Sequence, residues 1–116
     1  MIVDGRALAK EVLARTKARV ERLGRRPKVV AYAFSATPVT RAYLAMKARS
    51  AAAAGCEFEV REELPLIFDA DATIVQLPPP ADMDTKTILN SIPVDQDADV
   101  LSSAARAEGR LLPPVV

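Results

Sequence analysis

The sequence contains no histidine and only one cysteine, Cys56, among its 116 residues. A single cysteine cannot form a disulfide within the chain, and zinc sites built from cysteine and histidine are effectively excluded. Catalysis by a histidine base is excluded as well. No apolar run reaches the roughly 18 residues of a membrane-spanning helix, and the first residues do not resemble a signal peptide. These absences predict a cytoplasmic protein.

The sequence also lacks a strong charge of either sign, since its formal net charge is +1. Nucleic-acid and anionic-membrane partners usually require a basic stripe, so neither is expected. The cations gather along residues 6–28 but alternate with glutamates, which indicates a solvated helix face. Half of the residues are apolar, which is enough for the core of one domain of modest stability.

The first predicted helix covers residues 6–23, after Asp4 as N-cap and before Gly24 and Pro27. Arginines such as Arg15 would face the solvent. The expected buried stripe consists of Leu8, Val12, Val20 and Leu23.

Strands are predicted over three short runs, residues 28–34, 56–60 and 72–77. Two helices separate or follow them, at residues 38–54 and 84–92. The acidic run 95–101 is predicted to end on a fourth short strand, and residues 61–70 resist assignment. The alternation predicts a single α/β domain with a mostly parallel sheet flanked by helices in three layers. Ligands of such sheets gather beyond the carboxyl ends of the strands.

Tyr43 and Lys47 are spaced i, i+4, so they share one face of the predicted helix with Thr40. An aromatic plane beside an ammonium suits a flat, partly anionic ligand. The alternative is a half-buried tyrosine beside a surface lysine, and spacing alone favours this alternative.

Gln76 ends a predicted strand, and Leu77 and three prolines follow it. A buried amide needs partners, because an unmet one costs about 1–3 kcal/mol. The prolines stiffen the loop, which suits the positioning of a ligand, although a simple strand-ending turn is an equal alternative.

Three carboxylates, Asp95, Asp97 and Asp99, occupy alternate positions and would share one face of a strand. A ligand with hydrogen-bond donors, or a cation such as Lys47, would relieve their repulsion. A calcium loop is the competing interpretation, but its glycine and distal glutamate are missing, so no metal is expected.

Four stretches, in the order DGRALA, TPVTRAYLAMKARSAAAAG, IVQLPPP and IPVDQDADV, resemble the N-terminal catalytic domain of one enzyme family. It is the bifunctional methylenetetrahydrofolate dehydrogenase/methenyltetrahydrofolate cyclohydrolase (FolD-type) family. The resemblance spans almost the whole chain, and the order and separation of the motifs are more specific than any one of them. It implies that residues 1–116 form the folate-binding catalytic domain.

The resemblance implies that Lys47 is the catalytic lysine and that Gln76 positions its side chain and modulates its reactivity. It also implies that Asp99 binds the pterin. It implies that Tyr43 stacks on the folate ring system. Further residues of the implied substrate site are Thr40, Val75, Leu77, Pro78 and Asp97.

The sequence departs from the family pattern at several places. The family's usual Lys-Asp-Val-Asp-Gly run is replaced by residues 96–100, with Gln96 first and the β-branched Val100 in place of glycine. The segment 61–71 is shorter than the family's helix, and residues 34–38 replace a Val-Gly-Asp-type turn. The family's second, NADP-binding domain is absent from these 116 residues, and no Gly-x-Gly-x-x-Gly occurs. The ending RLLPPVV resembles the linker before that domain, which favours a fragment.

The implied function is the NADP-dependent oxidation of 5,10-methylenetetrahydrofolate and the hydrolysis of the methenyl product to 10-formyltetrahydrofolate. The tetrahydrofolate derivative is the substrate, and NADP would bind through the absent domain. A full-length form would be a homodimer, and the isolated domain a monomer. Two alternatives stay open: a folate-binding or interaction module without catalysis, and the substrate domain of a shikimate- or amino-acid-dehydrogenase-like enzyme.

Overall fold

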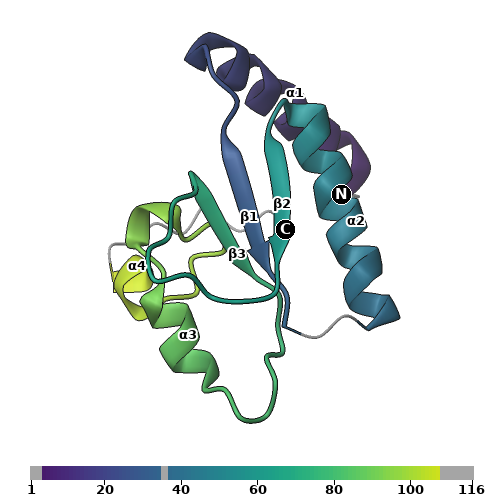
Figure 1. Ribbon diagram of the computed structural model, residues 1–116. Coiled ribbons are helices and arrows are strands. Elements are labelled where there is room, and N and C mark those ends of the chain that lie inside the picture. The colour runs from purple at the N-terminus through teal and green to yellow at the C-terminus, as the bar shows by residue number, and fades with distance from the viewer. Residues whose placement is uncertain (1–3, 35–36, 108–116) are drawn as a thin grey trace.

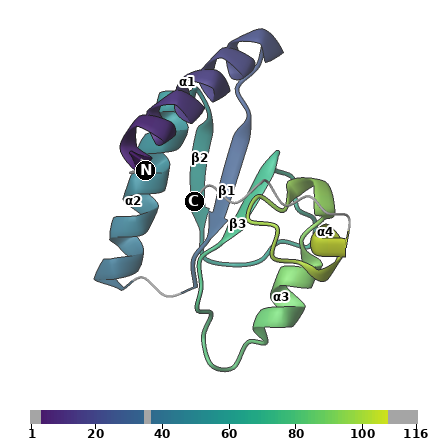
Figure 2. The same ribbon diagram turned by 180° about the vertical axis from the view of Figure 1, so that it is seen from behind.

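A three-stranded parallel sheet organises residues 4–34 and 37–107, which are the residues described by the computed structural model (Figure 1). Its strands run in the order β2-β1-β3, with bounds Lys28–Tyr32 for β1, Glu57–Arg61 for β2 and Ala72–Val75 for β3. One side carries α1 (Gly5–Leu23) and α2 (Pro38–Ala54). The other carries α3 (Thr85–Ser91), the 3₁₀ helix η1 (Val94–Gln96) and α4 (Ser103–Ala107), as the two opposite views show (Figures 1 and 2). The predicted α/β fold is therefore confirmed.

Helix α1 begins at Gly5, one residue before the predicted start, and ends at Leu23 as predicted. The Asp4 carboxylate accepts hydrogen bonds from the backbone N–H groups of Arg6 and Ala7, at 3.1 and 3.2 Å. Gly24 ends the helix with a φ of 76°, a left-handed conformation that glycine adopts without a steric penalty. Within the described residues, no helix is both long and apolar enough to cross a membrane.

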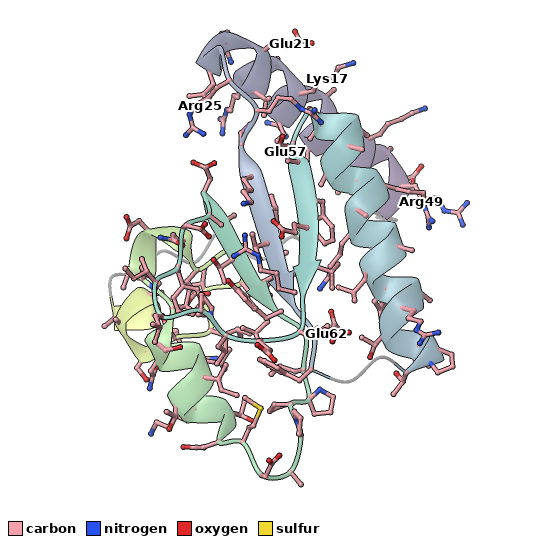
Figure 3. The ribbon with its side chains drawn as sticks, viewed as in Figure 1. Lys17, Glu21, Arg25, Arg49, Glu57 and Glu62 are labelled. Carbon is pink, nitrogen blue, oxygen red and sulfur yellow. The ribbon has the colours of Figure 1, made fainter. Side chains whose placement is uncertain are left out.

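The predicted buried stripe of α1 is only partly correct. Leu8 and Val20 are half-buried, but Val12 is 46% exposed and Leu23 is 53% exposed. The reason is that α1 packs on α2 and hardly touches the sheet. The predicted outward arginines are confirmed, because Arg15, Arg19 and Arg22 are exposed. Lys17 and Glu21 also point away from the sheet (Figure 3).

Strand β1 supplies the centre of the core on both faces of the sheet. Val30 and Tyr32 are buried on the side of α3, where the Tyr32 ring meets the edge of Phe68 at a centroid distance of 5.7 Å. Ala31 and Ala33 are buried on the opposite side, against α2. Because both faces of this strand are covered, its sequence is a continuous apolar run rather than an alternating one.

The predicted fourth strand is wrong. Within the described residues, the acidic run forms η1 and then a single parallel bridge between Asp97 and Thr73 of β3. The pairing stops there because Ala98 and Asp99 form a turn, in which the N–H of Val100 donates to the Asp97 carbonyl at 3.3 Å. Val100 itself has a φ of 55°. The three aspartates consequently do not share a strand face: Asp95 lies in η1 and is exposed, whereas Asp97 is buried.

A bidentate ion pair connects the segment after α1 to the residue before β3. The two terminal nitrogens of Arg25 donate to the Asp71 carboxylate at 3.0 and 2.8 Å, and the backbone N–H of Lys28 donates to the same carboxylate at 2.8 Å. The hydrogen bonds from Arg25, and then that from Lys28, lower the pKa of Asp71 from 3.8 to about 2.

We predict that this ion pair makes the stability of the fold pH-dependent. The pKa of Asp71 is lower in the folded chain, so the stabilisation is present above pH 3.8 and is lost as the pH falls towards about 2. Asp71→Asn should therefore lower the urea midpoint of unfolding at pH 7. The difference in midpoint between the variant and wild type should disappear as the pH falls from 3.8 to about 2. Urea unfolding of both proteins between pH 7 and pH 2 is the measurement. A difference that stays constant with pH would contradict the prediction.

Candidate functional site

The side chains of Lys47 and Gln76 meet at the carboxyl end of β3. The Lys47 ammonium donates a hydrogen bond of 3.1 Å to the Gln76 side-chain oxygen, and the contact is partly buried. Gln76 is placed by its own backbone, because its N–H donates to the Tyr32 carbonyl at 2.9 Å and so extends the pairing of β3 with β1. Helix α2 and the end of β3 therefore present one ammonium and one amide together.

The first half of α2 carries an exposed aromatic ring on the same helix face as Lys47. Tyr43 lies one turn before Lys47 and is 50% exposed, which leaves its ring available to stack on a flat ligand. Thr37 starts the helix by accepting from the N–H of Thr40 at 3.1 Å and donating to the Thr40 hydroxyl at 3.0 Å. The Thr40 hydroxyl is thereby fixed on the face that carries Tyr43 and Lys47.

The loop after Gln76 forms an apolar rim. Leu77 is 39% exposed and Pro78 is exposed, and the peptide bond between them is cis. Val75 is different, because its side chain is buried in the core on the side of α3. The side chains of Leu77 and Pro78 are thus accessible to a ligand, whereas that of Val75 is not.

The two aspartates after η1 have separate environments. The carboxylate of Asp97, which is 7% exposed, accepts the backbone N–H groups of Leu101 and Ser102 at 3.4 and 2.9 Å. Asp99 keeps contact with solvent, but surrounding protein raises the pKa of its carboxyl, while the Lys47 ammonium lowers it and the Asp97 charge raises it. Asp97 therefore shapes the loop, and Asp99 is the carboxylate within the electrostatic reach of Lys47.

Two residues that hold this loop were missed by the sequence analysis as contributors to the site. Gln96 donates to the Phe68 carbonyl at 3.1 Å and accepts from the Thr73 hydroxyl at 3.4 Å. Thr73 is almost fully buried, at 1% exposure. The available signal was the polar threonine at an inward position of a strand, because a buried hydroxyl needs a partner.

A hollow of about 360 Å³ opens beside Lys47, between α2 and the sheet. Its lining is almost entirely apolar and includes Met46, Phe58, Ile74 and Ala98. A larger groove, of about 900 Å³, runs along α1 and contains neither Lys47 nor Gln76. We place the candidate site at Lys47 and Gln76, beside the smaller hollow, because Lys47 lines this hollow whereas neither residue lines the larger groove.

The described residues contain no group of three histidine, cysteine, aspartate or glutamate side chains that could hold a metal ion. The Asp97 oxygens are engaged with backbone N–H groups. The arrangement is instead an ammonium, an amide and a carboxylate beside an exposed ring, which can bind a flat polar molecule and move a proton at Lys47.

No protein-family model matches the chain. The curated protein "Bifunctional protein FolD" of Thermotoga petrophila is 32% identical over 115 residues, which cover 90% of this chain and 42% of that protein. The FolD protein of Streptococcus sanguinis is 33% identical over 117 residues, or 84% of this chain and 41% of that protein. The chain thus spans less than half of the length of the curated relatives it matches.

Solved structures share the fold. The crystal structure of a bifunctional 5,10-methylenetetrahydrofolate dehydrogenase/cyclohydrolase from Thermoplasma acidophilum gives a TM-score of 0.80 at 18% identity, covering 92% of this chain and 44% of that chain. A 5,10-methylenetetrahydrofolate dehydrogenase from the silkworm Bombyx mori gives a TM-score of 0.79 at 21% identity, covering 92% and 43%.

Val100 should be strained, because its φ of 55° places a β-branched side chain in the left-handed region. We predict that Val100→Gly raises the free energy of unfolding by about 1 kcal/mol. Val60→Gly, in the regular strand β2, is the matched control and should lower it by about 0.5–1 kcal/mol. Urea unfolding measures both, and a destabilised Val100→Gly protein would contradict the strain.

Proposed function

Since the chain is homologous to a segment of the bifunctional FolD proteins, we propose that it is a folate-binding catalytic domain of one-carbon metabolism. The observation that carries the proposal is the 3.1 Å hydrogen bond between Lys47 and Gln76. These residues belong to two motifs that are 29 positions apart in the chain. The resemblance implies that these two side chains work together, and the contact supports that role.

The ligand would be a tetrahydrofolate derivative with its ring system against Tyr43, above the rim formed by Leu77 and Pro78. A pterin edge offers an amino group and a ring N–H side by side, and the Asp99 carboxylate can accept both as charge-assisted hydrogen bonds. The Asp97 carboxylate is already engaged with the backbone. Asp99 is for this reason the better anchor of the two.

The reaction assigned to these residues is the hydrolysis of 5,10-methenyltetrahydrofolate. Water adds to the cationic methenyl carbon while the Lys47 amine takes one of its protons. That proton passes to N5 as the bond between the carbon and N5 breaks, and the remaining hydroxyl proton leaves to solvent. The products are 10-formyltetrahydrofolate and one released proton. Gln76 would hold the Lys47 side chain in place through both transfers.

The residues of this chain do not fit NADP. The four glycines occupy positions 5, 24, 55 and 109, so the sequence has no glycine-rich turn of the dinucleotide-binding type. We therefore assign the folate site and the proton transfer to this chain, and no hydride transfer.

We predict that Lys47→Met lowers the rate of methenyltetrahydrofolate hydrolysis by about 10²–10⁴, the usual contribution of general acid–base catalysis. Binding of a folate analogue, measured by calorimetry, should change much less. Arg49→Met is the control, because Arg49 lies on the same helix but points away from the sheet (Figure 3).

The outcomes of this assay separate the candidate functions. An active Lys47→Met chain would overturn the role of Lys47. A wild-type chain that binds the analogue without turnover would be a folate-binding module without catalysis. Binding of shikimate or an amino acid in place of folate would identify the substrate domain of a different dehydrogenase.

We predict that Asp99→Asn weakens binding of the folate analogue by about one to two orders of magnitude, because an amide donor would then face a donor of the pterin. Asp97→Asn should act mainly on the stability of the fold, since its carboxylate caps two backbone N–H groups. Calorimetry and urea unfolding of both variants measure the two effects. Loss of binding in Asp97→Asn alone would move the anchor to Asp97.

A further inference from the structure

Gln96 connects three segments that are distant in the sequence. Its side-chain nitrogen donates to the carbonyl of Phe68 in the segment before β3, at 3.1 Å. Its side-chain oxygen accepts from the hydroxyl of Thr73 inside β3, at 3.4 Å. Both contacts are partly buried, so an apolar side chain at position 96 would leave two polar groups without these partners.

The backbone next to Gln96 continues this attachment. Asp97 forms the bridge with Thr73, and the N–H of Ala98 donates to the Thr73 carbonyl at 3.2 Å. On the far side of the loop, the Asp97 carboxylate holds the N–H of Ser102. Asp99 therefore lies in a loop whose two ends are held by hydrogen bonds. Gln96 holds the end next to β3, and the bond from Ser102 to Asp97 holds the other end.

The segment to which Gln96 is attached is itself anchored in the core. Phe68 contacts the buried ring of Tyr32 in β1, edge to face. A line of contacts thus runs from β1 through Phe68 to Gln96 and on to the loop of Asp99. Lys47 is connected to the same strand through Gln76, whose N–H donates to the Tyr32 carbonyl.

We propose that Gln96 is a positioning residue that sets where Asp99 stands relative to Lys47. It acts through the loop backbone and need not touch a ligand. The consequence for folate binding rests on the function proposed above, whereas the positioning itself concerns only residues of this chain.

The test measures the electrostatic coupling between Lys47 and Asp99 in the full 116-residue chain. The Asp99 carboxyl is titrated by ¹³C NMR with and without Lys47→Met, first in the wild-type background and then in Gln96→Met. Removing the ammonium should raise the pKa of Asp99 in the wild-type background, because the Lys47 charge lowers it. In Gln96→Met this rise should shrink by at least half, because the two groups are no longer held at one distance.

Asn90→Leu is the matched control. The Asn90 side chain also fixes a following segment, by accepting the N–H of Ser103 at 2.9 Å, but this hydrogen bond lies beyond the residues 96–102 that hold the loop of Asp99. The effect of Lys47→Met in this background should equal that in wild type. An equal effect in Gln96→Met would overturn the proposal.

Thr73→Val serves as a second variant, because it removes one of the two Gln96 contacts at nearly constant volume. It should reduce the coupling less than Gln96→Met, and it decides the question if Gln96→Met does not fold. An unchanged coupling in a folded Thr73→Val chain would then overturn the proposal.

Calorimetry with a folate analogue is the arm that depends on the proposed function. Gln96→Met should weaken binding about tenfold and Asn90→Leu less than about twofold. If wild type does not bind the analogue, the proposed function fails, while the NMR titration still decides the role of Gln96.

Discussion

The parallel pairing of β1 with β3 is the constraint on which the site depends. In this register Tyr32 lies beside Val75, and the next residue, Gln76, donates its N–H to the Tyr32 carbonyl. Ile74 packs on the side of α2 and Val75 on the side of α3, so Gln76 points to the side of α2 again. A shift of the register by one residue would turn the amide to the opposite face and away from Lys47.

The order of the helices and strands could be predicted because it follows from local rules, whereas the pairing of Lys47 with Gln76 was implied by the resemblance to the FolD-type family and is compatible with those rules. Apolar periodicity defines α2, and the spacing of Tyr43 and Lys47 puts them on one face of it. A short apolar run defines β3, and parallel strands bring their carboxyl ends to one edge. Neither step requires knowledge of distant contacts.

The two structural predictions that failed depend on tertiary contacts. Whether Val12 is buried depends on what α1 packs against, and α1 packs mainly on α2. Whether residues 95–101 form a strand depends on the Asp97 carboxylate, which turns back to the N–H of Ser102 and competes with sheet pairing. Alternation of acidic residues gives no indication of that competition.

The helices cover the two faces of the sheet unevenly, and this leaves different surfaces open. On the side of α3, the outer strand β2 carries charges instead of a helix: Glu59 pairs with Lys28 and Arg61, and Arg61 also pairs with Asp69. Charged residues protect such an edge strand from pairing with other chains. On the side of α2, the region over β3 stays apolar and forms the hollow beside Lys47. The proposed site therefore lies beside an apolar opening, where water is scarcer and a hydrogen bond such as that of Lys47 is stronger.

Two departures of this sequence from the FolD-type pattern, the short segment before β3 and the residues after η1, lie together in space, which indicates that they are physically connected. The short segment 62–71 contains no helix or strand, and it meets the loop of Asp99 through the bond from Gln96 to the Phe68 carbonyl. A lysine at position 96, as in the family pattern, has no acceptor to offer the Thr73 hydroxyl. Val100 follows on the same loop and keeps the left-handed backbone that glycine would adopt without strain. Since Asp97 and Gln96 hold the loop on either flank, their contacts would compensate the strain that we predict at Val100.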